Sequence, residues 1–284
     1  MASLRFLITF YTHPLVVGIL AFTFLLACTL LVLYASSQRA ILKRKTLLGL
    51  VSLSTFLWLF FILSILLCTY YEHEYLEYPL RIVKLIASIS ALAALTISLI
   101  LAALVNRRTK QYFLRNAPLC SFTKRERALL AKICATRNLP PVTFKKIRKE
   151  FPNAYSLSGK QDIIFFTKGL LDNLGPRELE AVILHEYAHL ANKDSTTRIY
   201  LAIMAKIIFF DPVLRYVHRT IGREMEFMAD DYAVAKLHQK KALLSALRNI
   251  NDYHLAHESF LPSLYSLKPE QVFLDERIAR LANY

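Results

Sequence analysis

The stretch that decides the fold is Gly175-Pro-Arg-Glu-Leu-Glu-Ala-Val-Ile-Leu-His-Glu-Tyr-Ala-His189. Pro176 suits the first position of a helix, where its missing N–H costs nothing, and the acidic residues that follow are favoured there by the helix dipole. The sequence therefore predicts a helix from Pro176 through His189. Residues four apart share one helical face, so His185 and His189 can converge on one zinc ion. Glu186 then lies beside the metal, where it can act as general base.

A second acidic motif, Glu226-Phe-Met-Ala-Asp230, begins 37 residues after His189. Catalytic zinc sites usually combine three protein ligands with a fourth position for water. We expect Glu226 to be the third ligand, and Asp230, on the same helical face, to accept the free ring N–H of a ligand histidine. Asp194 is a second candidate for such a supporting role. This second pattern alone is common on solvated helices, but coupled to the two histidines it favours Glu226 as a metal ligand.

Short strands precede the helix that carries His185-Glu-Tyr-Ala-His189, an HExxH motif. Residues 142–147, 154–157 and 163–166 have the composition of strands, and a turn-rich connection at 158–162 joins the last two. We expect a small antiparallel sheet within a mainly helical α+β domain. The strand at 163–166 could bind an extended substrate by edge pairing.

Three uncharged runs, at residues 14–35, 46–71 and 85–106, each reach the roughly 20 residues that a helix needs to cross a bilayer. Buried helices of a large soluble core are the alternative, but such a core seldom contains three charge-free runs of this length. The sequence therefore predicts a membrane region of residues 1–106 with three transmembrane helices, followed by a second domain at residues 107–284.

The net charge of +15 would suit nucleic-acid binding, yet much of it lies beside the predicted membrane helices. These basic residues are Arg39, Lys43, Arg44, Lys45, Arg107, Arg108, Lys110 and Arg115. The connection at 72–77 is acidic instead. By the positive-inside rule, the N-terminus lies outside the cell membrane and residues 107–284 lie in the cytoplasm. We expect contact with anionic lipid and no nucleic-acid partner.

A fourth apolar stretch, at residues 199–214, is interrupted by Lys206 and Asp211 and closed by Pro212. It is too short to span a bilayer. Two interpretations remain open: an interfacial or substrate-cleft helix lying against the membrane, or a helix packed in the core.

Residues 179–194 and 223–230 resemble membrane-bound gluzincin metallopeptidases of the HtpX and CAAX prenyl protease clan. Stretches at 153–157, 167–171 and 276–281 are similar to segments flanking the site of that family, so the resemblance covers about residues 150–281. Those relatives usually insert a membrane hairpin before the glutamate. The shorter gap here, with Phe209-Phe-Asp-Pro212, is more similar to the metallopeptidase domain of beta-lactam-sensing antirepressors of the BlaR/MecR type. The resemblance implies a zincin-like fold.

These observations predict an integral-membrane zinc endopeptidase that uses one Zn²⁺ and cleaves membrane or membrane-proximal proteins. Glu186 would take a proton from the attacking water and pass it to the leaving amine. Candidate donors to the oxyanion are His218, Arg223, His254 and His257. Two alternatives are a membrane signalling protease that cleaves a cytosolic regulator and a catalytically silent scaffold. The intact metal motifs argue against the scaffold.

Overall fold

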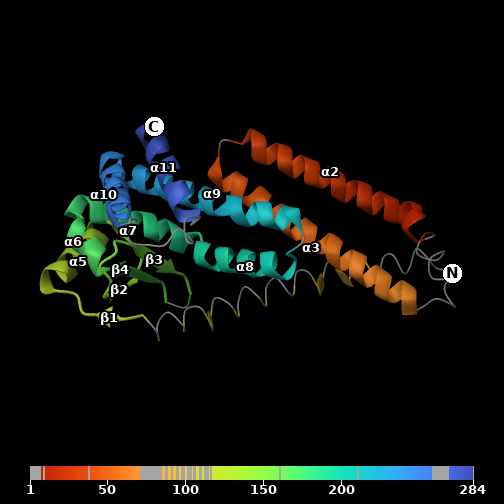
Figure 1. Cartoon of the computed structure of the whole chain (residues 1–284), viewed down its shortest axis with the longest axis horizontal. Coiled ribbons are helices and arrows are strands. Elements are labelled where there is room, and N and C mark those ends of the chain that lie inside the picture. Colours follow the sequence, from red (N-terminus) through yellow and green to blue (C-terminus); the bar gives the residue numbers. More distant parts are fainter. Residues whose placement is uncertain are drawn as a thin grey trace. The chain divides into compact units, whose positions relative to one another are not determined.

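The computed structural model (Figure 1) describes residues 8, 10–37, 39–70, 117–159, 161–209, 211–257 and 269–283, with scattered positions from 85 to 115. The chain forms two compact units. One comprises Met1–Ala103 and Tyr200–Ile221, and the other comprises Leu104–Ile199 and Gly222–Tyr284. Helices α8 (Asp194–Ile207) and α9 (Pro212–Leu237) each contribute residues to both units.

The first unit contains two helices, α2 (Pro14–Ser36) and α3 (Ala40–Tyr70), that pack against each other. Among the described residues, two helical spans are long and apolar enough to cross a membrane, Pro14–Ser36 and Ile41–Ile65. Two of the three predicted membrane helices therefore have counterparts. The third, at 85–106, lies outside the described residues apart from scattered positions.

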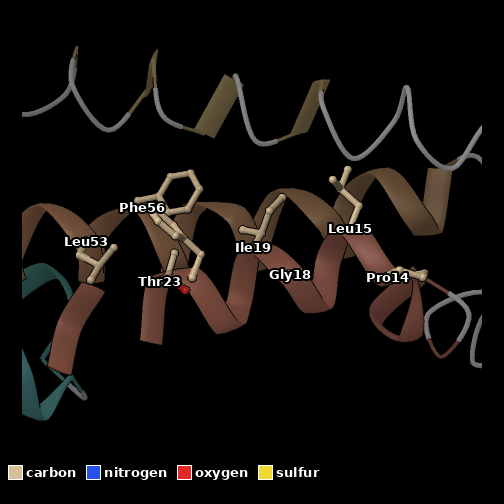
Figure 2. Close-up of a pocket in the computed structure, with 8 residues that line it drawn as sticks. Pro14, Leu15, Gly18, Ile19, Thr23, Leu53 and Phe56 are labelled. Atoms are coloured by element: carbon tan, nitrogen blue, oxygen red, sulfur yellow. The ribbon is translucent and has the colours of Figure 1, made fainter. Parts of the chain in front are cut away.

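Helix α3 begins earlier than the predicted membrane run, so Lys43, Arg44 and Lys45 belong to the helix and not to the connection. Lysine and arginine are good helix formers, and their long stems let the charged ends lie away from the apolar surface. Figure 2 shows a groove between α2 and α3 that is lined by Leu15 and Phe56 among others and has a volume of about 540 Å³.

A four-stranded sheet in the second unit has the order β1-β2-β4-β3. The strands are β1 (Leu119–Cys120), β2 (Thr143–Ile147), β3 (Ala154–Leu157) and β4 (Ile163–Thr167). β2 and β4 are parallel, whereas β1 pairs with β2 and β3 pairs with β4 in antiparallel fashion. The sheet is therefore mixed, and the prediction of an antiparallel sheet was wrong.

The burial of β4 explains this difference. All five residues of β4 are buried, and a continuous apolar run is typical of a strand covered on both faces. The short connection after β3 makes β3 the antiparallel neighbour of β4, so β2 pairs with the opposite edge of β4. Because both edges of β4 are occupied, it cannot pair with a substrate as predicted. β3 is the outer strand on this side of the sheet.

Helix α7 (Pro176–Ala191) begins at Pro176 as predicted and is buried on two sides. One side packs Leu179 and Ile183 against Ile164 of β4 and against α5 (Lys124–Arg137). The other side packs Leu184 in a cluster with α9, α10 (Lys241–His257) and α11 (Pro269–Ala282). A short helix, α6 (Lys168–Asn173), links β4 to α7. This packing buries the helix that carries His185 and His189 between the sheet and the C-terminal helices.

The apolar stretch at 199–214 is not one helix. It contains the end of α8, a turn and the first residues of α9. Pro212 begins α9, and the carboxylate of Asp211 accepts hydrogen bonds from the next free N–H groups, those of Val213 and Leu214. A proline in the first turn and an acidic cap before it are strong signals for starting a new helix.

Candidate metal centre

Three side chains from two helices converge in the second unit. His185 and His189, one turn apart on α7, are both buried, and their Nε2 atoms lie 3.1 Å from each other. Glu226 comes from α9: its Oε2 lies 3.2 Å from Nε2 of His185, and its Oε1 lies 3.5 Å from Nε2 of His189. One ligand atom from each residue can therefore reach a common point, as in a site for a metal ion.

The spacing of these atoms fits a tetrahedral metal. Ligands bound at about 2.0–2.1 Å in tetrahedral geometry are separated from each other by about 3.3 Å. The two Nε2 atoms, 3.1 Å apart, and the 3.2 Å between Nε2 of His185 and Oε2 of Glu226 lie close to this value, whereas the 3.5 Å contact with His189 belongs to the other carboxylate oxygen, Oε1. Two imidazole nitrogens and a carboxylate held this close repel one another when all three carry lone pairs. A cation between them would relieve that repulsion.

Two buried aspartates fix the orientation of the imidazole rings. Nδ1 of His189 lies 2.8 Å from Oδ2 of Asp194, and Nδ1 of His185 lies 2.9 Å from Oδ1 of Asp230. A carboxylate accepts the Nδ1–H, so each neutral ring has its proton on Nδ1 and its lone pair on Nε2. Both lone pairs then point toward the shared point.

Two arginines that sequence reasoning missed complete the cluster. Arg277 on α11 donates from Nε and Nη2 to the two oxygens of Asp230, at 2.8 and 2.7 Å, and from Nη1 to Oε2 of Glu226, at 2.8 Å. Arg198 on α8 donates from Nη2 to Oε1 of Glu226. Arg198 lies one helical turn after Asp194, a spacing that could have signalled its role. Arg277 lies within the stretch 276–281, already similar to the known family.

Burial and charge act against each other in this cluster. Burial favours the neutral acid of Glu226, but Arg277, together with His189, His185 and Arg198, holds its pKa well below the usual range. The pKa of Asp230 is lowered as well, because Arg277 outweighs the effect of burial. Burial and Arg277 would lower the pKa of His185, yet hydrogen bonds to Asp230 and Glu226 raise it to about 9.

The formal charge of the cluster matches a divalent cation. Four carboxylates and two guanidinium groups surround the histidines, which leaves a formal charge of −2 when both imidazoles are neutral, as metal binding requires. The fourth carboxylate is that of Glu186, which is buried on α7 and contributes to the electrostatic environment of both arginines. The donor set, the spacing and the charge all fit a divalent metal ion.

Four residues were predicted as donors to the oxyanion, and the structure describes the side chains of two of them, Arg223 and His218. Arg223 forms ion pairs with Glu224 and Glu276, so carboxylates outside the ligand cluster engage its guanidinium. His218 lies on the part of α9 that belongs to the first unit. The side chains of His254 and His257 lie outside the part of the chain that the structure describes.

Comparison with known proteins adds a family assignment to this geometry. A family model described as BlaR1 peptidase M56 matches residues 56–246, more than half of the chain. Protease HtpX homolog 2 of Methanosarcina mazei is 31% identical over 90 residues, which cover 31% of this chain and 30% of that protein. Protease HtpX homolog of Moorella thermoacetica is 31% identical over 86 residues, covering 29% and 28% of the two chains. Protease HtpX homolog of a Sulfurovum species is 24% identical over 155 residues, covering 44% and 56%.

Proposed function

Because the chain belongs to the BlaR1 peptidase M56 family, we propose that it is an integral-membrane endopeptidase that hydrolyses peptide bonds with one zinc ion. The observation that carries this proposal is the convergence of His185, His189 and Glu226 around one point. Two imidazoles and a carboxylate are a common ligand set of catalytic zinc and leave a fourth position open. The buried carboxylate of Glu186 supplies the base that such a reaction needs.

A bound zinc ion would polarise the scissile carbonyl and lower the pKa of the attacking water toward about 7. Glu186 accepts the proton of that water and returns it to the leaving amine. Asp194 and Asp230 keep the two imidazole rings oriented throughout the reaction. Arg277 holds Asp230 and Glu226 in one arrangement, so the carboxylate ligand need not reorganise.

Arg198 is the donor to the oxyanion in this proposal, in place of His218 and Arg223. Its guanidinium touches Glu226, and its side chain is 42% exposed, so it stands on the open side of the ligand cluster. The carboxylates of Glu186 and Asp194 also attract the guanidinium of Arg198 electrostatically. Negative charge developing on the substrate carbonyl there would attract the guanidinium. We expect Arg198→Met to bind zinc normally and to lose about 10²–10³ in kcat. Loss of zinc with kcat per bound zinc unchanged would contradict this role.

β3 is the strand placed to bind an extended substrate. One of its edges pairs with β4, and the strand also contacts α7. At its end, the N–H and Oγ of Ser158 lie 3.3 and 3.0 Å from Oγ of Ser195, the residue after Asp194. A peptide added along the outer edge would run beside the HExxH helix. The basic residues near the membrane helices support a cytoplasmic site, and hence substrates at the cytoplasmic membrane face.

Glu186→Gln tests the proposed function directly. The glutamine keeps the shape of the side chain but cannot accept the proton, so we expect full zinc content and a loss of about 10²–10⁴ in peptide cleavage. Glu180→Gln is the matched control, since Glu180 lies on the same helix and pairs with Arg137 instead. A Glu186→Gln protein that contains zinc and still cleaves would refute the assigned base.

The same pair of variants separates the candidate functions in cells. Membrane proteins that accumulate with Glu186→Gln support the endopeptidase proposed here. A soluble regulator that accumulates instead supports the signalling protease, which the family description of BlaR1 peptidase favours as the second candidate. Full zinc content without any accumulating protein would favour the scaffold.

A further inference from the structure

The turn between α8 and α9 carries a buried carboxylate that is bound on all sides within the first unit. Oδ2 of Asp211 accepts hydrogen bonds from Nε1 of Trp58, at 2.8 Å, and from Oγ of Ser54. Oδ1 accepts from the N–H groups of Val213 and Leu214, at 2.7 and 3.1 Å. Asp211 thus begins α9 and at the same time ties this turn to α3. An acid in hydrocarbon is tolerated only when its polar atoms are satisfied in this way.

The partners of Asp211 fix the depth of the turn. Ser54 lies next to residue 53, the midpoint of Ile41–Ile65, the part of α3 that is long and apolar enough to cross a membrane. A helix rises 1.5 Å per residue, so Ser54 lies about 2 Å from that midpoint and Trp58 about 8 Å from it. The hydrocarbon layer extends about 15 Å on each side of its centre. A turn bonded to both residues therefore lies well inside the hydrocarbon.

The outer surface of the turn is apolar, as this depth requires. Phe209, Val213 and Tyr216 are 68%, 38% and 48% exposed. Between residues 208 and 214 the sequence has one charged residue, Asp211, and its side chain points inward. The nearest basic residues in the sequence are Lys206 on the α8 side and Arg215 and Arg219 on the α9 side. Arg215 and Arg219 are exposed, and long stems can carry their charges toward the headgroups.

We propose that the end of α8 and the start of α9 form a re-entrant membrane hairpin whose tip lies in the lipid hydrocarbon. Asp211 latches this tip to the transmembrane helix α3. The acyl chains of the bilayer cover the side chains of Phe209 and Val213. This surface is distinct from the metal centre, and the proposal does not depend on peptidase activity. Residues 199–214 are then neither a helix lying against the membrane nor a helix packed in the core, because the hairpin enters the membrane.

Site-directed spin labelling of the full chain in lipid nanodiscs tests the depth of the tip. In a cysteine-free background (C28A, C68A, C120A, C134A), single labels are placed at Phe209→Cys and Val213→Cys. Leu25→Cys, on the exposed surface of α2, is the lipid reference, and Ala235→Cys, near the end of α9, is the water reference. We expect the tip labels to collide with oxygen and to lose collisions with a water-soluble nickel chelate, as Leu25→Cys does.

Two results would overturn the proposal. Nickel collisions at the level of Ala235→Cys would place the tip in water, and protection from both reagents would show that protein covers it. Zinc content and cleavage are measured on the same samples, so that loss of the metal centre is distinguished from a wrong depth.

The latch is tested with the double variant Ser54→Ala, Trp58→Phe, which removes both donors to Oδ2 but leaves the helix cap intact. We expect the label at position 209 to gain nickel collisions because the tip is no longer held. An unchanged collision profile would overturn the role of Asp211 as a latch. Asp211→Ala serves as a second variant. In this variant the label at position 209 should gain at least as many nickel collisions, and unchanged collisions would likewise overturn the role of Asp211 as a latch.

Discussion

Loss of Arg277 should destabilise the second unit more than loss of any comparable surface arginine. The side chain is only 12% exposed and makes three charge-assisted hydrogen bonds of 2.7–2.8 Å, two to Asp230 and one to Glu226. In Arg277→Met, the fully buried Asp230 keeps its contact with His185 but loses its counter-charge. Removing one partner of a buried ion pair costs about 3–5 kcal/mol. The free energy of unfolding should fall by about this amount.

Arg280 provides the matched control on the same helix. It pairs with Asp231 at 2.7 Å, but both side chains are about one third exposed, so this pair contributes about 0–1 kcal/mol. Its guanidinium also lies over the ring of Phe227, at 4.6 Å from the centroid, a contact of similar size. Arg280→Met should therefore cost about 1 kcal/mol.

Thermal unfolding of the detergent-solubilised protein measures both effects. For a unit of this size, 1 kcal/mol shifts Tm by about 2–4 °C, so we expect a fall of about 6–20 °C for Arg277→Met and about 2–4 °C for Arg280→Met. Added zinc should recover part of the loss in Arg277→Met, because zinc would bind Glu226 but not Asp230. Equal shifts for the two variants, in chelator and in zinc, would refute this account of the buried charges.

Three further predictions concern the metal centre and the fold. Asp194→Asn should weaken zinc binding about 10–100-fold, measured by competition with a chromophoric chelator, because the ring of His189 loses its carboxylate. Gly169→Ala should lower Tm sharply, since a Cβ atom there would lie 1.6 Å from the backbone oxygen of Glu150. Gly222→Ala, where a Cβ meets nothing within 4 Å, should raise stability by up to about 1 kcal/mol; a Tm as low as that of Gly169→Ala would contradict the steric argument.

Much of the local structure follows from near neighbours in the sequence. The uncharged run at 14–35 predicts a helix that the structure shows at Pro14–Ser36, and α7 begins at Pro176 as the sequence predicts. Both depend on features within one or two turns: uncharged length, a proline at the first turn and the preceding cap. His185, Glu186 and His189 were grouped for the same reason, because the period of a helix alone places residues i and i+4 on one face.

Tertiary structure decided whatever depends on partners far along the chain. The apolar run of β4 predicts a strand, but only packing on both of its faces makes it central, and this led to the parallel pairing with β2. Arg277 is 47 residues from Asp230 and 92 from His185, so no local pattern pairs them. Likewise, Asp211 is 157 residues from Ser54. Buried carboxylates need compensating partners, but sequence alone does not say which ones, since that choice depends on how the helices pack.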